Sequence, residues 1–138
     1  MADFVATHRL THEASLKMLA AGVAKANALG VKISLAVVDA SGQLIAFLMM
    51  DGARFFSGRT TIKKAITSAS QRLPTGYAPE DRVISMQIRM DGDFTNVLGG
   101  FPITVEGQVI GGVAAGGAKE EEDAIVAKAA LAALGLPG

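Results

Sequence analysis

Apolar and polar positions alternate along the chain with two periods, one typical of helices and one typical of strands. Residues 12–29 carry apolar side chains at helical spacing directly after Thr11, a residue type that caps helix N-termini. Gly30 follows where the helix should end, because glycine readily adopts the left-handed conformation of a C-terminal cap. A second run with the same spacing covers about residues 57–71. The pattern therefore predicts two amphipathic helices in the first half of the chain.

Strand-like runs lie between and after these helices. Residues 33–38 are apolar or small on both faces, which is typical of a strand covered on both sides. A turn over residues 39–42 leads into a returning strand over residues 44–50. Because neighbouring strands are joined by tight turns, we expect a mostly antiparallel sheet. Three further strands are predicted over residues 94–98, 101–105 and 108–115.

The pattern weakens between residues 73 and 93, where prolines and a glycine predict an irregular loop with a short helix over residues 81–90. From Lys119 onward, acids in the first turn and apolar residues at helical spacing predict a last helix to about residue 133. The element order predicts one domain over residues 1–138 with an α/β fold of the α+β type. Its five-stranded antiparallel sheet, flanked by helices, would form a profilin-like or PAS-like layer.

Composition narrows the chemistry. The 138 residues include no cysteine and two histidines, which excludes disulfides and thiolate ligands. Thirteen basic residues balance thirteen acidic ones without long runs, so neither nucleic acid nor a membrane surface is an expected partner. We find no pattern of a secretory signal and expect a cytoplasmic location. With 50% hydrophobic and 19% charged residues, the chain is predicted to self-associate.

Three stretches of sequence form ordered motifs. Residues 35–44 read as a strand with a D-x-x-G turn, and M-D-G-A follows at residues 50–53. Residues 99–111 read G-G-F-P-I-T-V-E-G-Q-V-I-G, and a second glycine pair precedes Asp123 and an alanine-rich helix. This order resembles the GlcG/HbpS-like family of haem-binding or haem-degrading proteins, which also occurs as the C-terminal domain of PduO-type corrinoid adenosyltransferases.

The resemblance implies a GlcG-type layer, homo-oligomers from dimer to octamer, and binding of haem or a related tetrapyrrole in some members. Two segments depart from the family pattern. Residues 79–87 are more polar and helix-prone than the family's glycine- and proline-rich segment, so we expect ligand specificity to vary there. Residues 116–119 lack the Thr-Pro or Ser-Pro of the family, which leaves contacts inherited at that turn in question.

Two residue types that ligate haem iron occur at candidate positions. His12 lies beside the predicted helix N-terminus, which favours the neutral imidazole and makes His12 the candidate metal ligand. Tyr77, the only tyrosine, could ligate ferric iron or stack on a ring. The alternatives are a solvated His12 and ordinary loop packing of Tyr77. His8 is a weaker candidate in the segment before the helix.

Basic residues gather around the start of the second predicted helix. Arg54, Arg59 and Lys64 are candidates to bind a carboxylate, either a haem propionate or a small organic acid. The alternative is a solvated helix face. Glycine pairs allow the backbone to approach a ligand closely, or simply form turns. The pairs that we include among the candidate cofactor-binding residues are Gly99 with Gly100 and Gly116 with Gly117.

Other residues have competing interpretations. Asp123 could act as a base, although four acids in succession also fit a first helical turn that complements the helix dipole. Methionines could line a tetrapyrrole pocket, but core filling is the simpler interpretation for Met49, Met50, Met86 and Met90.

Three hypotheses follow. The first is a cytoplasmic haem-binding protein that would aid haem degradation and iron release. The second is a small enzyme acting on an organic acid or an intermediate of aromatic catabolism, as encoded in a catabolic operon. The third is an oligomeric accessory protein without catalysis. Spacing alone assigns no catalytic residue.

Overall fold

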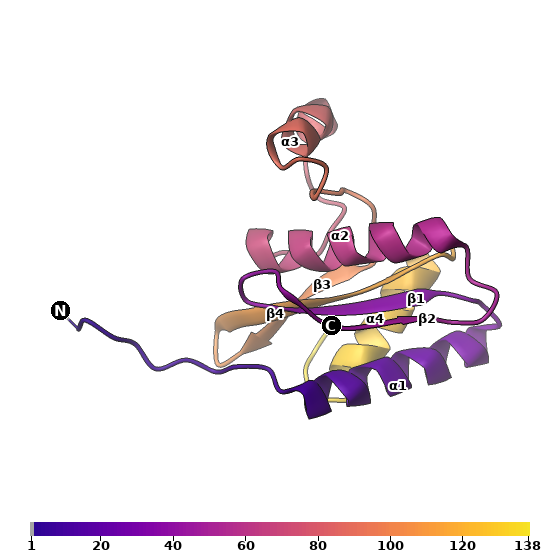
Figure 1. Ribbon diagram of the computed structural model, residues 1–138, viewed down its shortest axis with the longest axis horizontal. Coiled ribbons are helices and arrows are strands. Elements are labelled where there is room, and N and C mark those ends of the chain that lie inside the picture. The colour runs from indigo at the N-terminus through magenta and orange to yellow at the C-terminus, as the bar shows by residue number, and fades with distance from the viewer. Residues whose placement is uncertain (1) are drawn as a thin grey trace.

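A four-stranded antiparallel sheet forms the centre of the molecule, in the order β2-β1-β4-β3. The computed structural model describes residues 2–138, and Figure 1 shows helices covering both faces of the sheet. The antiparallel sheet flanked by helices confirms the predicted fold class. Its elements are α1 (His12–Leu29), β1 (Ser34–Asp39), β2 (Leu44–Met49), α2 (Phe55–Gln71), the 3-10 helix η1 (Glu80–Arg82), α3 (Val83–Arg89), β3 (Gly100–Val105), β4 (Gln108–Gly116) and α4 (Glu120–Ala132).

The predicted strand over residues 94–98 is wrong, and the sheet has four strands rather than five. The backbone of this segment bonds to side chains instead of to a neighbouring strand. Thr95 N–H donates to Thr67 Oγ1 at 3.1 Å, and Leu98 N–H donates to Glu120 Oε1 at 2.9 Å. Because these donors are already satisfied, the segment stays outside the sheet.

Sequence signals at the helix ends agree with the structure. Thr11 Oγ1 accepts a hydrogen bond from Ala14 N–H at 3.1 Å, which caps α1 as predicted. Gly30 closes the helix with φ of 72°. The second helix begins at Phe55, two residues earlier than its spacing indicated.

The two faces of the sheet are covered differently. Helices α1 and α4 pack on one face and bury a continuous apolar core there. Helix α2 packs on the other face, where a Cβ at Gly112 would overlap the carbonyl oxygen of Ala65. This close approach leaves room mainly for small residues. The small core on the α2 side consists of Ala36, Val38, Ala65, Ala69 and Ala114.

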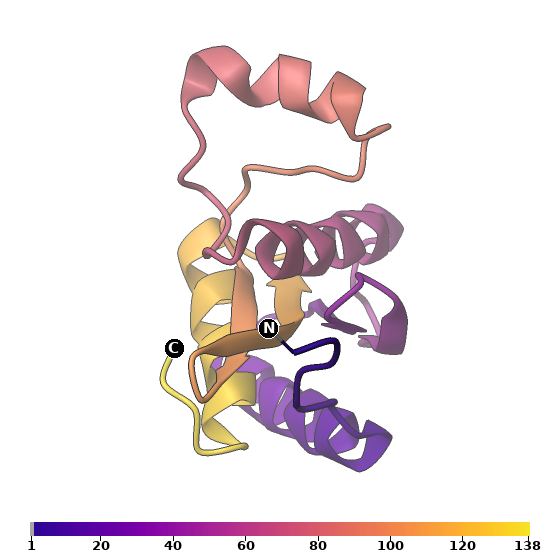
Figure 2. The same ribbon diagram turned by 90° about the vertical axis from the view of Figure 1, so that its left-hand side faces the viewer.

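Residues 73–97, which we call the arm, leave the body after α2 and return to it before β3. The arm contains η1 and α3, so the short helix predicted over residues 81–90 is confirmed. Figure 2 shows α3 standing away from α2 and the sheet. No residue of α3 is buried.

Candidate functional site

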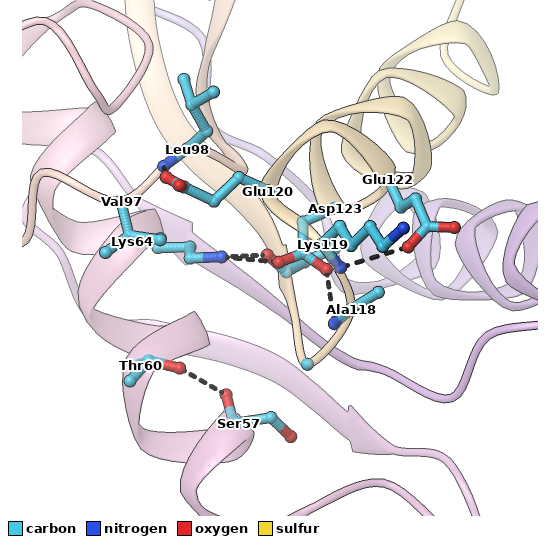
Figure 3. Close-up of polar contacts among 12 residues, drawn as sticks. Ser57, Thr60, Lys64, Val97, Leu98, Ala118, Lys119, Glu120, Glu122 and Asp123 are labelled. Atoms are coloured by element: carbon cyan, nitrogen blue, oxygen red, sulfur yellow. Dashed lines mark hydrogen bonds and ion pairs between the residues drawn. The ribbon is translucent and has the colours of Figure 1, made fainter.

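A cleft of about 320 Å³ opens where the first turns of α2 and α4 meet the loop after β4. We call it the α2–α4 cleft. Arg54 and Glu120 contribute charged groups, and Phe56 and Val97 contribute apolar surface. Lys64 and Asp123 also line it, and Figure 3 shows their side chains pointing toward one another.

Lys64 and Asp123 form a buried ion pair. Lys64 Nζ lies 3.1 Å from Asp123 Oδ2 and donates a second hydrogen bond to Ala115 O at 2.9 Å. The two side chains are 2% and 3% exposed. Asp123 Oδ1 accepts a hydrogen bond from Ala118 N–H at 3.0 Å. The pair therefore ties α2, the end of β4 and the start of α4 together at the base of the cleft.

Burial raises the pKa of the Asp123 carboxyl above its ordinary value of 3.8, because a carboxylate loses hydration there. The Lys64 ammonium and the Ala118 N–H act in the opposite direction, since both stabilise the charged form. Removing Lys64 would therefore raise the Asp123 pKa further.

Glycines surround this ion pair because their backbones approach it closely. A Cβ at Gly99 would lie 2.9 Å from Lys64 Nζ, and one at Gly100 would overlap the Lys64 carbonyl oxygen. A Cβ at Gly116 would overlap Thr61 Oγ1 and lie 3.4 Å from Lys64 Nζ. These three predicted residues thus make space for the Lys64 side chain and for the approach of α2.

The rim of the cleft is basic. Arg54 is exposed and donates from Nη2 to Gly117 O at 3.2 Å, so its guanidinium lies across the loop after β4. A second hollow of about 450 Å³ lies beside it and is also lined by Lys32, Lys119 and Glu122. Glu122 accepts a hydrogen bond from Lys119 N–H at 3.2 Å. Three cations and one carboxylate make this second hollow, at the rim of the cleft, suited to an anionic ligand.

The structure brings together some of the predicted residues. Arg54, Lys64 and Gly117 all line the cleft, and Gly99, Gly100 and Gly116 lie directly behind it. Arg59 is exposed on α2 and lies over the Phe56 ring, with Cζ 5.8 Å from the ring centroid.

The two proposed iron ligands lie elsewhere. The His12 side chain is 78% exposed, with Nε2 3.2 Å from Glu13 Oε1. Helix α1 has 18 residues, about 27 Å of helix, and Lys32 of the basic rim follows its far end. Tyr77 is 72% exposed and belongs to the arm. His8 Nε2 lies 3.8 Å from Glu106 Oε2.

The methionines follow the simpler interpretation in part. Met50 packs against the apolar core, whereas Met49 is 39% exposed. Met86 lines a hollow of about 250 Å³ between the arm and α2. Of the methionines after residue 1, none lines the α2–α4 cleft.

Sequence reasoning underestimated Asp123. The first-turn interpretation explained it as one of four acids, but its side chain is buried on the same face as Val126, Ala127 and Ala130. An acid in register with a buried apolar stripe was the signal available in the sequence, because such a position requires a partner.

A haem fits the rim but not the base of this cleft. Arg54, Lys32 and Lys119 are suitable partners for its carboxylates. Among the residues that the structure describes, no histidine, methionine or tyrosine lines the cleft to bind iron, and the chain has no cysteine. Within residues 2–138, no group of three or more histidine or acidic side chains is arranged to hold a metal ion. No helix in that part of the chain is long and apolar enough to span a membrane.

The model of the family described as "Haem degrading protein HbpS-like" matches residues 10–132. Among curated proteins, the corrinoid adenosyltransferase PduO of Citrobacter freundii is 28% identical in an alignment 137 residues long that covers 96% of this chain. The chain corresponds to 38% of the length of that relative.

Two solved structures share the fold. A PduOC:heme complex is similar with a TM-score of 0.84 and 25% identity, covering 91% of this chain and 95% of the other. A double mutant of Streptomyces reticuli HbpS is similar with a TM-score of 0.85 and 29% identity, covering 97% and 92% of the two chains.

Proposed function

The chain belongs to the HbpS-like family, whose model spans residues 10–132, and from that premise we propose that it binds haem. The observation that carries the proposal is the basic rim of the α2–α4 cleft, in a chain similar to a PduOC:heme complex. Arg54, Lys32 and Lys119 would hold the carboxylates of the macrocycle. Gly117 would allow the backbone to approach the ligand, because it has no side chain and its φ is 117°.

His12 is the proposed iron ligand. Its imidazole is exposed, and Glu13 is its one polar partner within residues 2–138. Because α1 separates it from Arg54 of the same chain, a haem bound by both residues would lie between two copies. The proposal therefore includes a homo-oligomer.

Bound haem would supply a redox-active iron. The chain's own residues would orient the macrocycle through Arg54 and hold the walls of the cleft together through Lys64 and Asp123. On the family description we extend the proposal to haem degradation, which would release iron. From the sequence expectation alone we extend it to a cytoplasmic location.

A haemin titration followed by absorbance tests this proposal. We expect a saturable Soret shift in the wild type, a loss of that shift in His12→Ala, and about 10- to 100-fold weaker binding in Arg54→Ala, since a charge-assisted hydrogen bond contributes about 1.5–3 kcal/mol. His8→Ala and Lys25→Ala, which removes an exposed lysine of α1, are matched controls and should bind normally. A weak, nonsaturating titration of the wild type would contradict haem binding.

The buried Lys64–Asp123 pair favours a second candidate function. A cleft of about 320 Å³ with a buried ion pair at its base and Arg54 at its rim also suits a small organic acid. Arg54 would bind the carboxylate of the acid, and the Asp123 carboxylate would accept a proton from the acid. Calorimetric titration with a panel of small carboxylic acids tests this candidate, and binding that is unchanged in Arg54→Ala would count against it.

A further inference from the structure

Helix α3 turns two isoleucines toward solvent. Ile84 and Ile88 lie four positions apart on one face of the helix, and each is 72% exposed. Met86 lies on the opposite face and lines the hollow between the arm and α2 of the same chain. The body thus partly covers one side of α3, while the isoleucine side has no partner within residues 2–138.

Such a helix needs an external partner. Helix α3 has seven residues, and isolated helices shorter than about 12 residues are marginal in water. Tertiary packing would supply its stability, but none of its residues is buried.

The exposed apolar surface of the arm approaches that of a protein interface. At about 100–200 Å² for each large side chain, its exposed residues present about 400–700 Å², compared with about 800 Å² per partner in a standard interface. These residues, each 42–72% exposed, are Leu73, Tyr77, Ile84, Ile88, Met90 and Val97.

The arm and the outer surface of α2 carry opposite net charge. The arm carries four acids and two arginines, which gives it a net negative charge. Helix α2 contains no acid, and apart from the buried Lys64 its basic residues face outward with those that flank it. Phe55 and Phe56 extend this basic surface, stacked at 4.6 Å and 67% and 61% exposed. The outward basic residues are Arg54, Arg59, Lys63 and Arg72.

We propose that the arm is a dimerisation element, which packs the Ile84 and Ile88 face of α3 over the basic and aromatic surface of α2 in a second copy. In a two-fold symmetric dimer each arm packs on α2 of the other copy. The apolar face of α3 and the aromatic surface of α2 are therefore both covered in each copy. The inference rests on the self-association in the proposed function and is independent of haem.

Sedimentation velocity over a dilution series tests the inference. The wild type is expected to dimerise, with weaker association at high salt because the two surfaces have opposite charge. The double variant Ile84→Ser and Ile88→Ser is expected to raise the dissociation constant at least tenfold. Leu16→Ser is the matched control, since Leu16 is 60% exposed on α1, outside the proposed interface.

Arg59→Glu is a second, independent variant and should also weaken the dimer. Circular dichroism of each variant checks that the fold is retained. A dimer that survives both the isoleucine and the Arg59 substitutions would overturn the assignment of the arm and leave self-association intact. A wild type that stays monomeric at all concentrations would overturn self-association itself and would indicate a different protein as the partner of the arm.

Discussion

The two faces of the sheet are packed with different kinds of side chain. The face under α1 and α4 buries large apolar side chains such as Met18, Leu35 and Ile103. The face under α2 has a small alanine-rich core and a row of buried polar residues on the helix, including Ser57, Thr61, Lys64 and Ser68.

The difference shows what each face contributes. The apolar face stabilises the fold through the apolar area that it buries. When a methyl group is removed there, the neighbouring side chains relax in part and limit the cost. The α2 face depends on the close approach of its backbone to the sheet and on one satisfied ion pair. A substitution that disturbs either one is expected to lower the free energy of unfolding strongly. The candidate site lies at the end of this second face.

The largest effect is expected from breaking the ion pair on the α2 face. Lys64→Met leaves Asp123 buried without its cation and should lower the free energy of unfolding by about 3–5 kcal/mol. Urea denaturation measures the loss. Lys63→Met is the matched control, because Lys63 is only half-buried and makes no ion pair in residues 2–138.

Two further measurements make this prediction sharper. The double variant Lys64→Met with Asp123→Asn should be more stable than Lys64→Met alone, because no charge is then left unpaired. The stability of Lys64→Met should also fall as pH rises above 3.8, since its folded state holds the Asp123 proton longer than the unfolded chain does. A flat pH profile would show that Asp123 finds another partner.

A methyl group added to the α2 face should cost more than one removed from the apolar face. Gly112→Ala would push a Cβ against Ala65 O and should cost about 2 kcal/mol through overpacking. Ile103→Val should cost about 1 kcal/mol, because it removes one buried methyl group. Thermal unfolding of the two variants compares them directly. Equal or reversed costs would mean that the faces do not differ in this way.

The smallest effect is expected at the turn between β1 and β2, outside both faces. Asp39 Oδ1 accepts hydrogen bonds from Ser41 N–H and Oγ–H and from Gln43 N–H. The bond from Ser41 is the main cause that lowers the Asp39 pKa below 3.8. Asp39→Ala should therefore cost about 1 kcal/mol at neutral pH.

The difference between Asp39→Ala and the wild type should shrink as pH falls through the lowered pKa, because the protonated carboxyl loses these bonds. Chemical denaturation at pH 7 and pH 3 measures it. Ser41→Ala retains the backbone bonds and should show a smaller loss. A cost that does not depend on pH would assign the effect to turn conformation instead.

Local signals predicted most of the fold. Thr11 and Gly30 marked the ends of α1, and tight turns indicated antiparallel pairing. The strand prediction for residues 94–98 failed although their apolar composition fits a strand. The side chains of Thr67 and Glu120, which are distant in sequence, accept hydrogen bonds from the backbone of this segment. That information is tertiary.

The site was predictable only in its basic and glycine components. Arg54 and the glycine pairs stood out by position in the motifs, but the pairing of Lys64 with Asp123 joins residues 59 positions apart. His12 was chosen for its helix-end chemistry, and the direction of α1 then separates it from Arg54 in the same chain. No periodicity in the sequence encodes that distance.

The attachment of the arm divides the molecule into parts of unequal local stability. Its roots are held at Thr75, whose N–H donates to Gly100 O at 3.0 Å and whose Oγ1 accepts from Gly100 N–H, and at Thr95, which bonds to Thr67. Beyond these roots nothing in α3 is buried, so amide protons there can exchange with solvent through a local opening. Those of β1 and β4 exchange only when the whole sheet unfolds. In an isolated monomer, therefore, amide exchange in α3 would measure the free energy of local opening of the arm. Amide exchange in β1 and β4 would measure the free energy of global unfolding.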